Sequence, residues 1–209
     1  MINRITPLLL SLSFAKDWLT TSAIIIMVFF FCSCEDTKTD STNIVDYGVV
    51  INEINYNSSD GFDPEDWVEL HNPTNETIAI GLWAFKDDND DHVFTLSENI
   101  VLSPGQYLVL CKDADVFSEL FPNVSKFVGD LGFGLSASGE LVRLFESNGL
   151  LIDEVEYDDV VPWPILADGN GPTVELINPS LDNALGENWA ASDGYGTPGA
   201  VNSVYVADE

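Results

Sequence analysis

Short alternations of apolar and polar residues run along the chain from Gly48 onward, and Gly, Pro, Asn and Asp separate them. A period of two directs successive side chains to opposite faces of a strand, so one face is buried and the other is not. The sequence therefore predicts a β-sandwich. Its eight expected strands are residues 49–54, 67–71, 78–85, 92–96, 107–111, 141–145, 152–157 and 173–177.

One segment, residues 113–121, has a helical pattern instead. Val116, Phe117 and Leu120 share one apolar face, and Pro122 ends the pattern. We expect a short crossover helix here. Turns are predicted at residues 104–105, 148–149 and 197–199, where Pro-Gly, Asn-Gly and Thr-Pro-Gly stand between extended runs.

The amino-terminal region has the pattern of a targeting segment. Residues 22–31 are uninterruptedly apolar, a run shorter than the roughly 20 residues that a membrane-spanning helix needs. Ser33 precedes Cys34, and the chain then becomes acidic at once, which resembles a lipobox. The predicted organisation is a lipoprotein signal peptide (1–33), a flexible acidic tether (34–46) and one domain (47–206).

Cys34 is therefore the predicted lipidation site, and the predicted location is the bacterial cell envelope, most simply the outer membrane. Cys32 fits less well, because bulky Phe31 precedes it. Two alternatives stay open: the amino-terminal segment is an uncleaved anchor, or the chain starts downstream of Met1. The sequence also does not determine on which face of the membrane the domain lies.

The charge balance narrows the range of partners. Thirty-five acidic against seven basic residues give a net charge of -28, which repels nucleic acid and anionic lipid headgroups. We expect no nucleic-acid partner, a monomer, and a surface that is either simply well solvated or able to bind divalent cations. The three cysteines, Cys32, Cys34 and Cys111, do not form a disulfide framework, and Cys111 is expected to be a small buried apolar residue.

Several motifs follow one another in an order typical of a known family. They are VINEI (50–54), DWVELHNP (66–73), IAIGLW (78–83), LSPGQYLVL (102–110), LSASGELV (135–142), DGNGPTVEL (168–176) and GTPGAVN (196–202). Together they resemble a lamin-tail domain. The resemblance implies an all-β, immunoglobulin-like β-sandwich, and a module that bacterial relatives export alone or attached to surface hydrolases.

Catalytic chemistry finds little support in the sequence. The two histidines, His71 and His92, lie in no nucleophile-elbow setting, and we expect both at surface turns. Two histidines and one spare thiol do not make a zinc site, and no glycine-rich loop opens a helix that could hold phosphate. The sequence predicts no catalytic residues and no resident cofactor, with calcium as the one exception to test.

A calcium loop is the closest metal motif. Asp87, Asn89, Asp91, Thr95 and Glu98 occupy positions 1, 3, 5, 9 and 12 of the template. Its sixth position, however, holds His92 instead of Gly, and the residues that follow alternate as a strand does. The candidate ligands are therefore Asp87, Asn89, Asp91 and Glu98, with a solvated acidic turn as the alternative.

Among the other carboxylates, Glu53 and Glu69 stand inside strand-like motifs and are the first candidates for a specific role. The alternative is that each anchors a loop by accepting backbone hydrogen bonds.

The function predicted from these features is a noncatalytic binding or scaffold module with an unidentified protein or glycan partner. An accessory component of an extracellular nuclease- or phosphatase-type hydrolase system and a calcium-stabilised adhesin are the alternatives.

Overall fold

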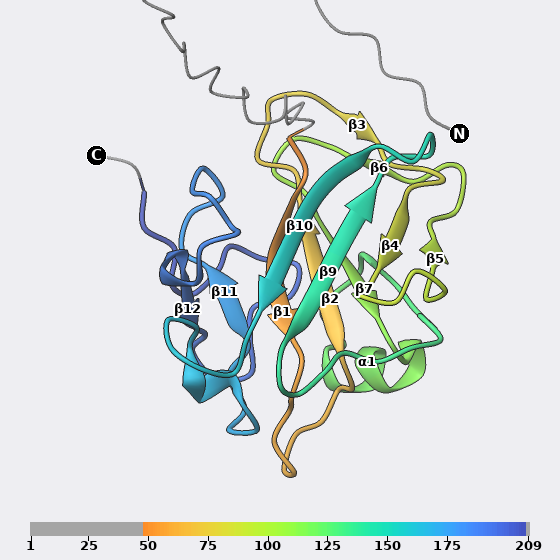
Figure 1. Ribbon diagram of the computed structural model, residues 1–209. Coiled ribbons are helices and arrows are strands. Elements are labelled where there is room, and N and C mark those ends of the chain that lie inside the picture. Colours follow the sequence, from red (N-terminus) through yellow and green to blue (C-terminus); the bar gives the residue numbers. More distant parts are fainter. Residues whose placement is uncertain (1–47, 208–209) are drawn as a thin grey trace, which may run out of the picture. The chain divides into compact units, whose positions relative to one another are not determined.

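The computed structural model describes residues 48–207, which form two main sheets packed face to face (Figure 1). The predicted signal peptide, Cys34 and the tether lie outside the described residues. Within 48–207, no helix has the length and apolar character needed to cross a membrane.

The larger sheet has six strands in the order β12-β11-β1-β2-β7-β8. All neighbours are antiparallel except β7 and β8, which are parallel. The strands are β1 (Val50–Asn55), β2 (Trp67–His71), β7 (Tyr107–Cys111), β8 (Phe127–Val128), β11 (Val174–Leu176) and β12 (Trp189–Ala191).

The second sheet has four strands in the order β10-β9-β4-β5, and a small pair of strands, β3 and β6, lies beside the sandwich. Their bounds are β3 (Ile78–Ala79), β4 (Ala84–Lys86), β5 (Phe94–Thr95), β6 (Val101–Leu102), β9 (Glu140–Phe145) and β10 (Leu151–Tyr157). Two 3₁₀ turns, η1 (Ile165–Ala167) and η2 (Gly186–Asn188), lie in the loops before β11 and β12.

The main core lies between the two sheets. Val68 and Leu70 of β2 belong to the same buried cluster as Val142 and Leu144 of β9. This is the apolar face that the alternation in residues 67–71 predicts, and the all-β sandwich is confirmed.

The outer face of the six-stranded sheet is also covered. The single helix of the described residues, α1 (Ala114–Leu120), packs Phe117 against Trp67, Val109 and Cys111, all of them fully buried. Asp113 begins the helix by accepting a hydrogen bond from the Val116 amide at 2.9 Å. The predicted helix and the predicted burial of Cys111 are confirmed, and burial raises the pKa of the Cys111 thiol to about 12.

Two predicted strands are wrong in their bounds. The segment 78–85 is divided into β3 and β4, because Leu82 has a φ of 65° and the backbone at Gly81 lies against Glu98. In 92–96 only Phe94–Thr95 is a strand, because the His92 side chain bonds back to Asp87 in the preceding turn. The predicted turns at Gly105, Gly149 and Gly199 are confirmed, each with positive φ.

Candidate functional site

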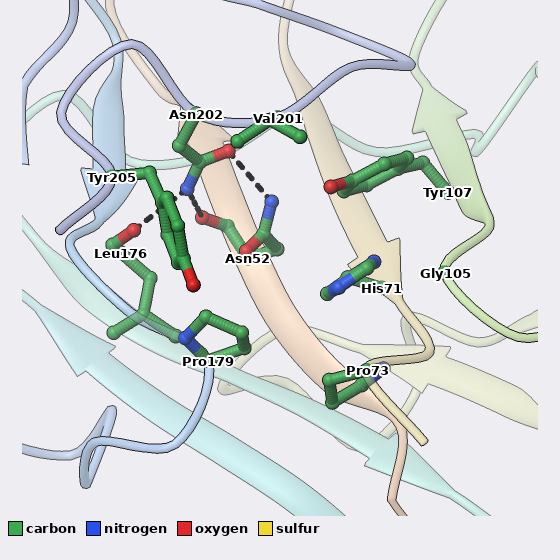
Figure 2. A pocket seen from close by; sticks show the side chains of 10 residues that line it. All are labelled: Asn52, His71, Pro73, Gly105, Tyr107, Leu176, Pro179, Val201, Asn202 and Tyr205. Carbon is green, nitrogen blue, oxygen red and sulfur yellow. Dashed lines mark hydrogen bonds between the residues drawn. The ribbon is translucent and has the colours of Figure 1, made fainter. Parts of the chain in front are cut away.

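A pocket of about 390 Å³ opens on the outer face of the six-stranded sheet (Figure 2). Its floor comes from β1, β2 and β11, and one wall comes from the segment that follows β12. No charged side chain lines it. The lining residues are Asn52, His71, Pro73, Gly105, Tyr107, Leu176, Pro179, Val201, Asn202 and Tyr205.

A β-bulge places Asn52 on this floor. The pairing of β1 with β2 shifts register between Ile51 and Glu53, so Asn52 and Glu53 both contact outer-face residues while Ile51 and Ile54 remain in the core. An extra residue of this kind re-aims the side chains beside it. Strict alternation along the strand does not predict this arrangement.

The Asn52 amide is held in one orientation. Its Nδ2 donates to Asn202 Oδ1 at 2.7 Å and to Glu69 Oε1 at 3.1 Å. Asn202 in turn donates to the backbone oxygens of Asn52 and Leu176. Asn52 Oδ1 accepts no hydrogen bond from the residues that the structure describes, and it lies on the pocket side of the amide (Figure 2).

His71 supplies a second acceptor. Its ring stacks on Tyr107 with 4.2 Å between centroids, and its Nδ1 lies 3.2 Å from the Gln106 carbonyl oxygen. Burial lowers the pKa of His71, so the ring is neutral near pH 7 and Nδ1 carries the hydrogen. Nε2, the nitrogen on the pocket side in Figure 2, is then an acceptor.

The predicted surface position of His71 is therefore wrong. The side chain is buried in β2, because the loop containing Gly105 and Gln106 covers it.

Two tyrosines form the aromatic walls of the pocket. Tyr107 is half-buried, and burial raises the pKa of its phenol to about 12, so the ring stays neutral at physiological pH. Tyr205 lies opposite on the C-terminal segment and is 46% exposed. The pocket thus combines flat apolar surfaces with two hydrogen-bond acceptors on its floor.

A row of buried glutamates lies beside this floor. Glu53 is paired in register with Glu69 of β2 on one side and with Glu175 of β11 on the other, and all three are fully buried. Each accepts hydrogen bonds from the C-terminal segment. The donors are the Thr197 amide to Glu53, the Gly199 amide to Glu69, and Thr197 Oγ1, Ser203 Oγ and the Val204 amide to Glu175.

The interpretation of Glu53 and Glu69 as loop anchors is thus confirmed. They fix the segment that carries Val201, Asn202 and Tyr205, and so they build one wall of the pocket. The sequence reasoning missed Glu175, although its setting, Val174-Glu175-Leu176, repeats the apolar-Glu-apolar pattern around Glu69.

Burial also changes the ionisation of two of these glutamates, Glu69 and Glu53. It raises the pKa of Glu69 to about 8 and that of Glu53 well above its ordinary value, and the neighbouring carboxylates act in the same direction on both. Glu53 Oε2 has no hydrogen-bond partner within residues 48–207. Because the row is covered by the C-terminal segment, its carboxyl groups hold that segment in place and do not line an open cleft.

The predicted calcium ligands lie around the turn between β4 and β5. Asp87 Oδ1 accepts from the Asn89 amide at 2.8 Å, and Asn89 Oδ1 accepts from the Asp91 amide at 3.0 Å. Asp87 Oδ2 lies 2.6 Å from His92 Nδ1. These side chains therefore stabilise the turn itself, and Glu98 lies outside it, at a second turn beside Gly81.

A different acidic group gathers at the same turn. Carboxylate oxygens of Asp87, Asp88 and Glu140 lie within 4.8 Å of one another. Glu140 comes from β9, so the sequence spacing around Asp87 does not reveal it. Hard oxygen ligands of this kind suit calcium.

Comparison with known proteins agrees with this architecture. The model of the family described as Lamin Tail Domain matches residues 46–159. The chain belongs to the lamin tail domain family. The resemblance drawn from the motifs is thus confirmed, as is the immunoglobulin-like fold, and the family is one of noncatalytic domains.

Among curated proteins, this lamin tail domain chain is similar to the multifunctional procollagen lysine hydroxylase and glycosyltransferase LH3 of Homo sapiens, Pongo abelii and Rattus norvegicus. The identity is 32% over 114 residues in each case. The match covers 54% of this chain but only 13% of each relative.

Proposed function

We propose that this lamin tail domain chain is a noncatalytic binding module of the bacterial cell envelope, anchored by lipid at Cys34, that holds a neutral glycan in the pocket between Tyr107 and Tyr205. The observation that carries this proposal is the pair of acceptors, Asn52 Oδ1 and His71 Nε2, on the floor of a pocket without charged side chains.

The chemistry of the pocket selects this ligand class. Two acceptors call for a ligand that brings donors, and sugar hydroxyl groups are donors. Ring faces and prolines beside them suit the C–H surfaces of a sugar ring, as in other sites that combine apolar walls with a few placed polar groups. An anionic ligand would meet acceptors and an acidic domain, so its binding is disfavoured.

A glycan array tests the ligand class. The chain is applied to immobilised neutral, sulfated and uronic-acid glycans, and we expect retention on neutral glycans only. If sulfated glycans retain the chain as well as neutral glycans do, or if no glycan retains it, the proposal of a neutral glycan ligand is rejected.

The anchor is tested separately by labelling cells with an alkynyl fatty acid. Cys34→Ser should abolish the label, whereas Cys32→Ser should keep it. If only Cys32→Ser loses the label, the lipidated residue is Cys32 and not Cys34.

A second candidate, a calcium-stabilised adhesin, is supported by the grouping of Asp87, Asp88 and Glu140. The two functions are compatible, since the acidic group lies at the turn between β4 and β5 and the start of β9, whereas the pocket lies on the six-stranded sheet.

A further inference from the structure

The loop that follows β10 exposes an unusual amount of apolar surface. Val160 is 55% exposed, Val161 78%, Ile165 56% and Leu166 61%. Single exposed aliphatic residues are common on protein surfaces, but four within seven positions concentrate apolar surface on one loop, and concentrations of this kind mark interaction sites. We call these four residues the aliphatic patch.

The backbone beneath the aliphatic patch is fixed. Trp163 is buried against Trp189 with 5.6 Å between ring centroids, and Ala167 is buried as well. The Trp163 amide donates to the Val160 carbonyl oxygen at 3.0 Å, and the Ala167 amide donates to Pro164 at 3.1 Å. The exposed side chains are therefore held in place on an ordered loop, which reduces the entropy that a partner must overcome.

Carboxylates border the aliphatic patch on both sides in the chain. Asp158 and Asp159 precede it and Asp168 follows it. Burial raises the pKa of the Tyr56 phenol and the negative charges of these three aspartates raise it further, so all three lie near Tyr56. The four basic side chains within residues 48–207 are engaged elsewhere. Lys86 and Arg143 pair with Asp90, Lys112 pairs with Glu65, and Lys126 donates to Gln106.

This combination determines which partner fits. A second copy of this chain or an anionic membrane surface would bring negative charge toward the three aspartates. A partner with an apolar centre and a rim of Lys and Arg would bury the aliphatic patch and supply the missing cations.

We propose that the aliphatic patch is a docking surface for a protein segment whose apolar side chains are flanked by Lys or Arg. The surface is separate from the glycan pocket. His71 of the pocket pairs with Val50 at the start of β1, whereas Tyr157, which leads into the loop, stacks on Tyr56 just beyond the other end of β1. The module can therefore hold a glycan and a protein at the same time.

Two synthetic peptides with the same leucine-rich centre, one flanked by lysines and the other by glutamates, test the proposal on the full chain. We expect the lysine peptide to bind roughly tenfold more tightly or better, and the double variant Val161→Ser/Leu166→Ser to lose roughly tenfold in affinity. Asp158→Asn/Asp159→Asn should weaken binding and reduce its dependence on salt.

Matched controls separate the aliphatic patch from general surface effects. Val93→Ser/Val101→Ser changes two exposed valines elsewhere, 46% and 44% exposed, and should leave the affinity unchanged. Equal affinity for both peptides, or equal loss in the patch and control variants, would overturn the proposal. A lipid would also overturn it. If the Cys34→Ser chain binds phosphatidylglycerol vesicles and the added substitutions Val161→Ser/Leu166→Ser abolish that binding, the aliphatic patch binds lipid and not a protein segment.

Discussion

Glu53 and Glu69 are directly paired across β1 and β2, with both carboxylates buried beneath the C-terminal segment. Glu53 accepts a hydrogen bond from the Thr197 backbone amide of that segment, and Glu69 accepts one from the Gly199 backbone amide. Because the same segment carries Tyr205, the protonation of this pair is coupled to the integrity of the pocket that we propose binds a glycan.

The first prediction concerns the pH dependence of stability. Glu69 has a pKa of about 8 in the folded chain against 4.5 in the unfolded chain, so between these values the folded state binds more protons. The stability that Glu69 contributes is fully present below about pH 4.5 and is lost as pH rises to about 8. Glu53 acts in the same direction. Urea unfolding should show a free energy of unfolding that falls between about pH 4.5 and 8, by at most ~1.4 kcal/mol per pH unit for each group.

Glu53→Gln is the matched variant, because a glutamine mimics the neutral acid and keeps an oxygen for Thr197. Its stability should fall less steeply over the same pH range. A slope identical to that of the unmodified chain would show that Glu53 does not take up the proton.

The second prediction concerns Asn202, which connects the C-terminal segment to the sheet. Asn202→Ala removes bonds to Asn52 and Leu176 and leaves their buried carbonyl groups without this partner. We expect a loss of about 2–4 kcal/mol in the free energy of unfolding. Asn75→Ala, at an exposed loop position, should change it by less than about 0.5 kcal/mol. Similar effects of the two variants would contradict the role given to Asn202.

The third prediction concerns the break between β3 and β4. A Cβ added at Gly81 would lie 1.9 Å from the Glu98 carbonyl oxygen, so Gly81→Ala requires the backbone to move. We expect a loss of about 1–3 kcal/mol, measured by chemical unfolding. Gly61 has open space around its Cβ position and no positive φ, so Gly61→Ala should leave the stability nearly unchanged.

The fourth prediction concerns calcium. If Asp87, Asp88 and Glu140 bind the ion, calcium should raise the thermal midpoint and EDTA should reverse the rise. Asp88→Asn should abolish the shift, whereas Asp91→Asn should keep it. If only Asp91→Asn loses the shift, the ligand set predicted from the sequence spacing is supported instead. If calcium does not shift the thermal midpoint at all, the domain does not bind calcium.

The sequence predicts the parts of the fold that depend on local pattern. The strand at 67–71 and the helix after Asp113 follow from alternation and capping, and the structure contains both. The break at Leu82 follows from a contact with Glu98, which lies in another segment, so no local pattern reveals it.

The sequence does not predict the pocket. Asn52, His71, Tyr107 and Tyr205 are distant in the chain and meet only because β1, β2 and β7 are neighbours under the C-terminal segment. The bulge that turns Asn52 and Glu53 to the same face depends on pairing with β2. His71 looks like a turn residue in the sequence because Asn72-Pro73 follows it, and its burial depends on the separate loop at Gln106.

The most direct test of the central claim is titration calorimetry of a neutral glycan selected on the array against two matched variants. Tyr205 and Tyr195 are equally exposed, at 46%, but only Tyr205 lines the pocket. Glycan binding in this pocket predicts that Tyr205→Ala loses roughly tenfold or more in affinity while Tyr195→Ala stays within about twofold of the unmodified chain. Unchanged affinity in Tyr205→Ala would contradict it.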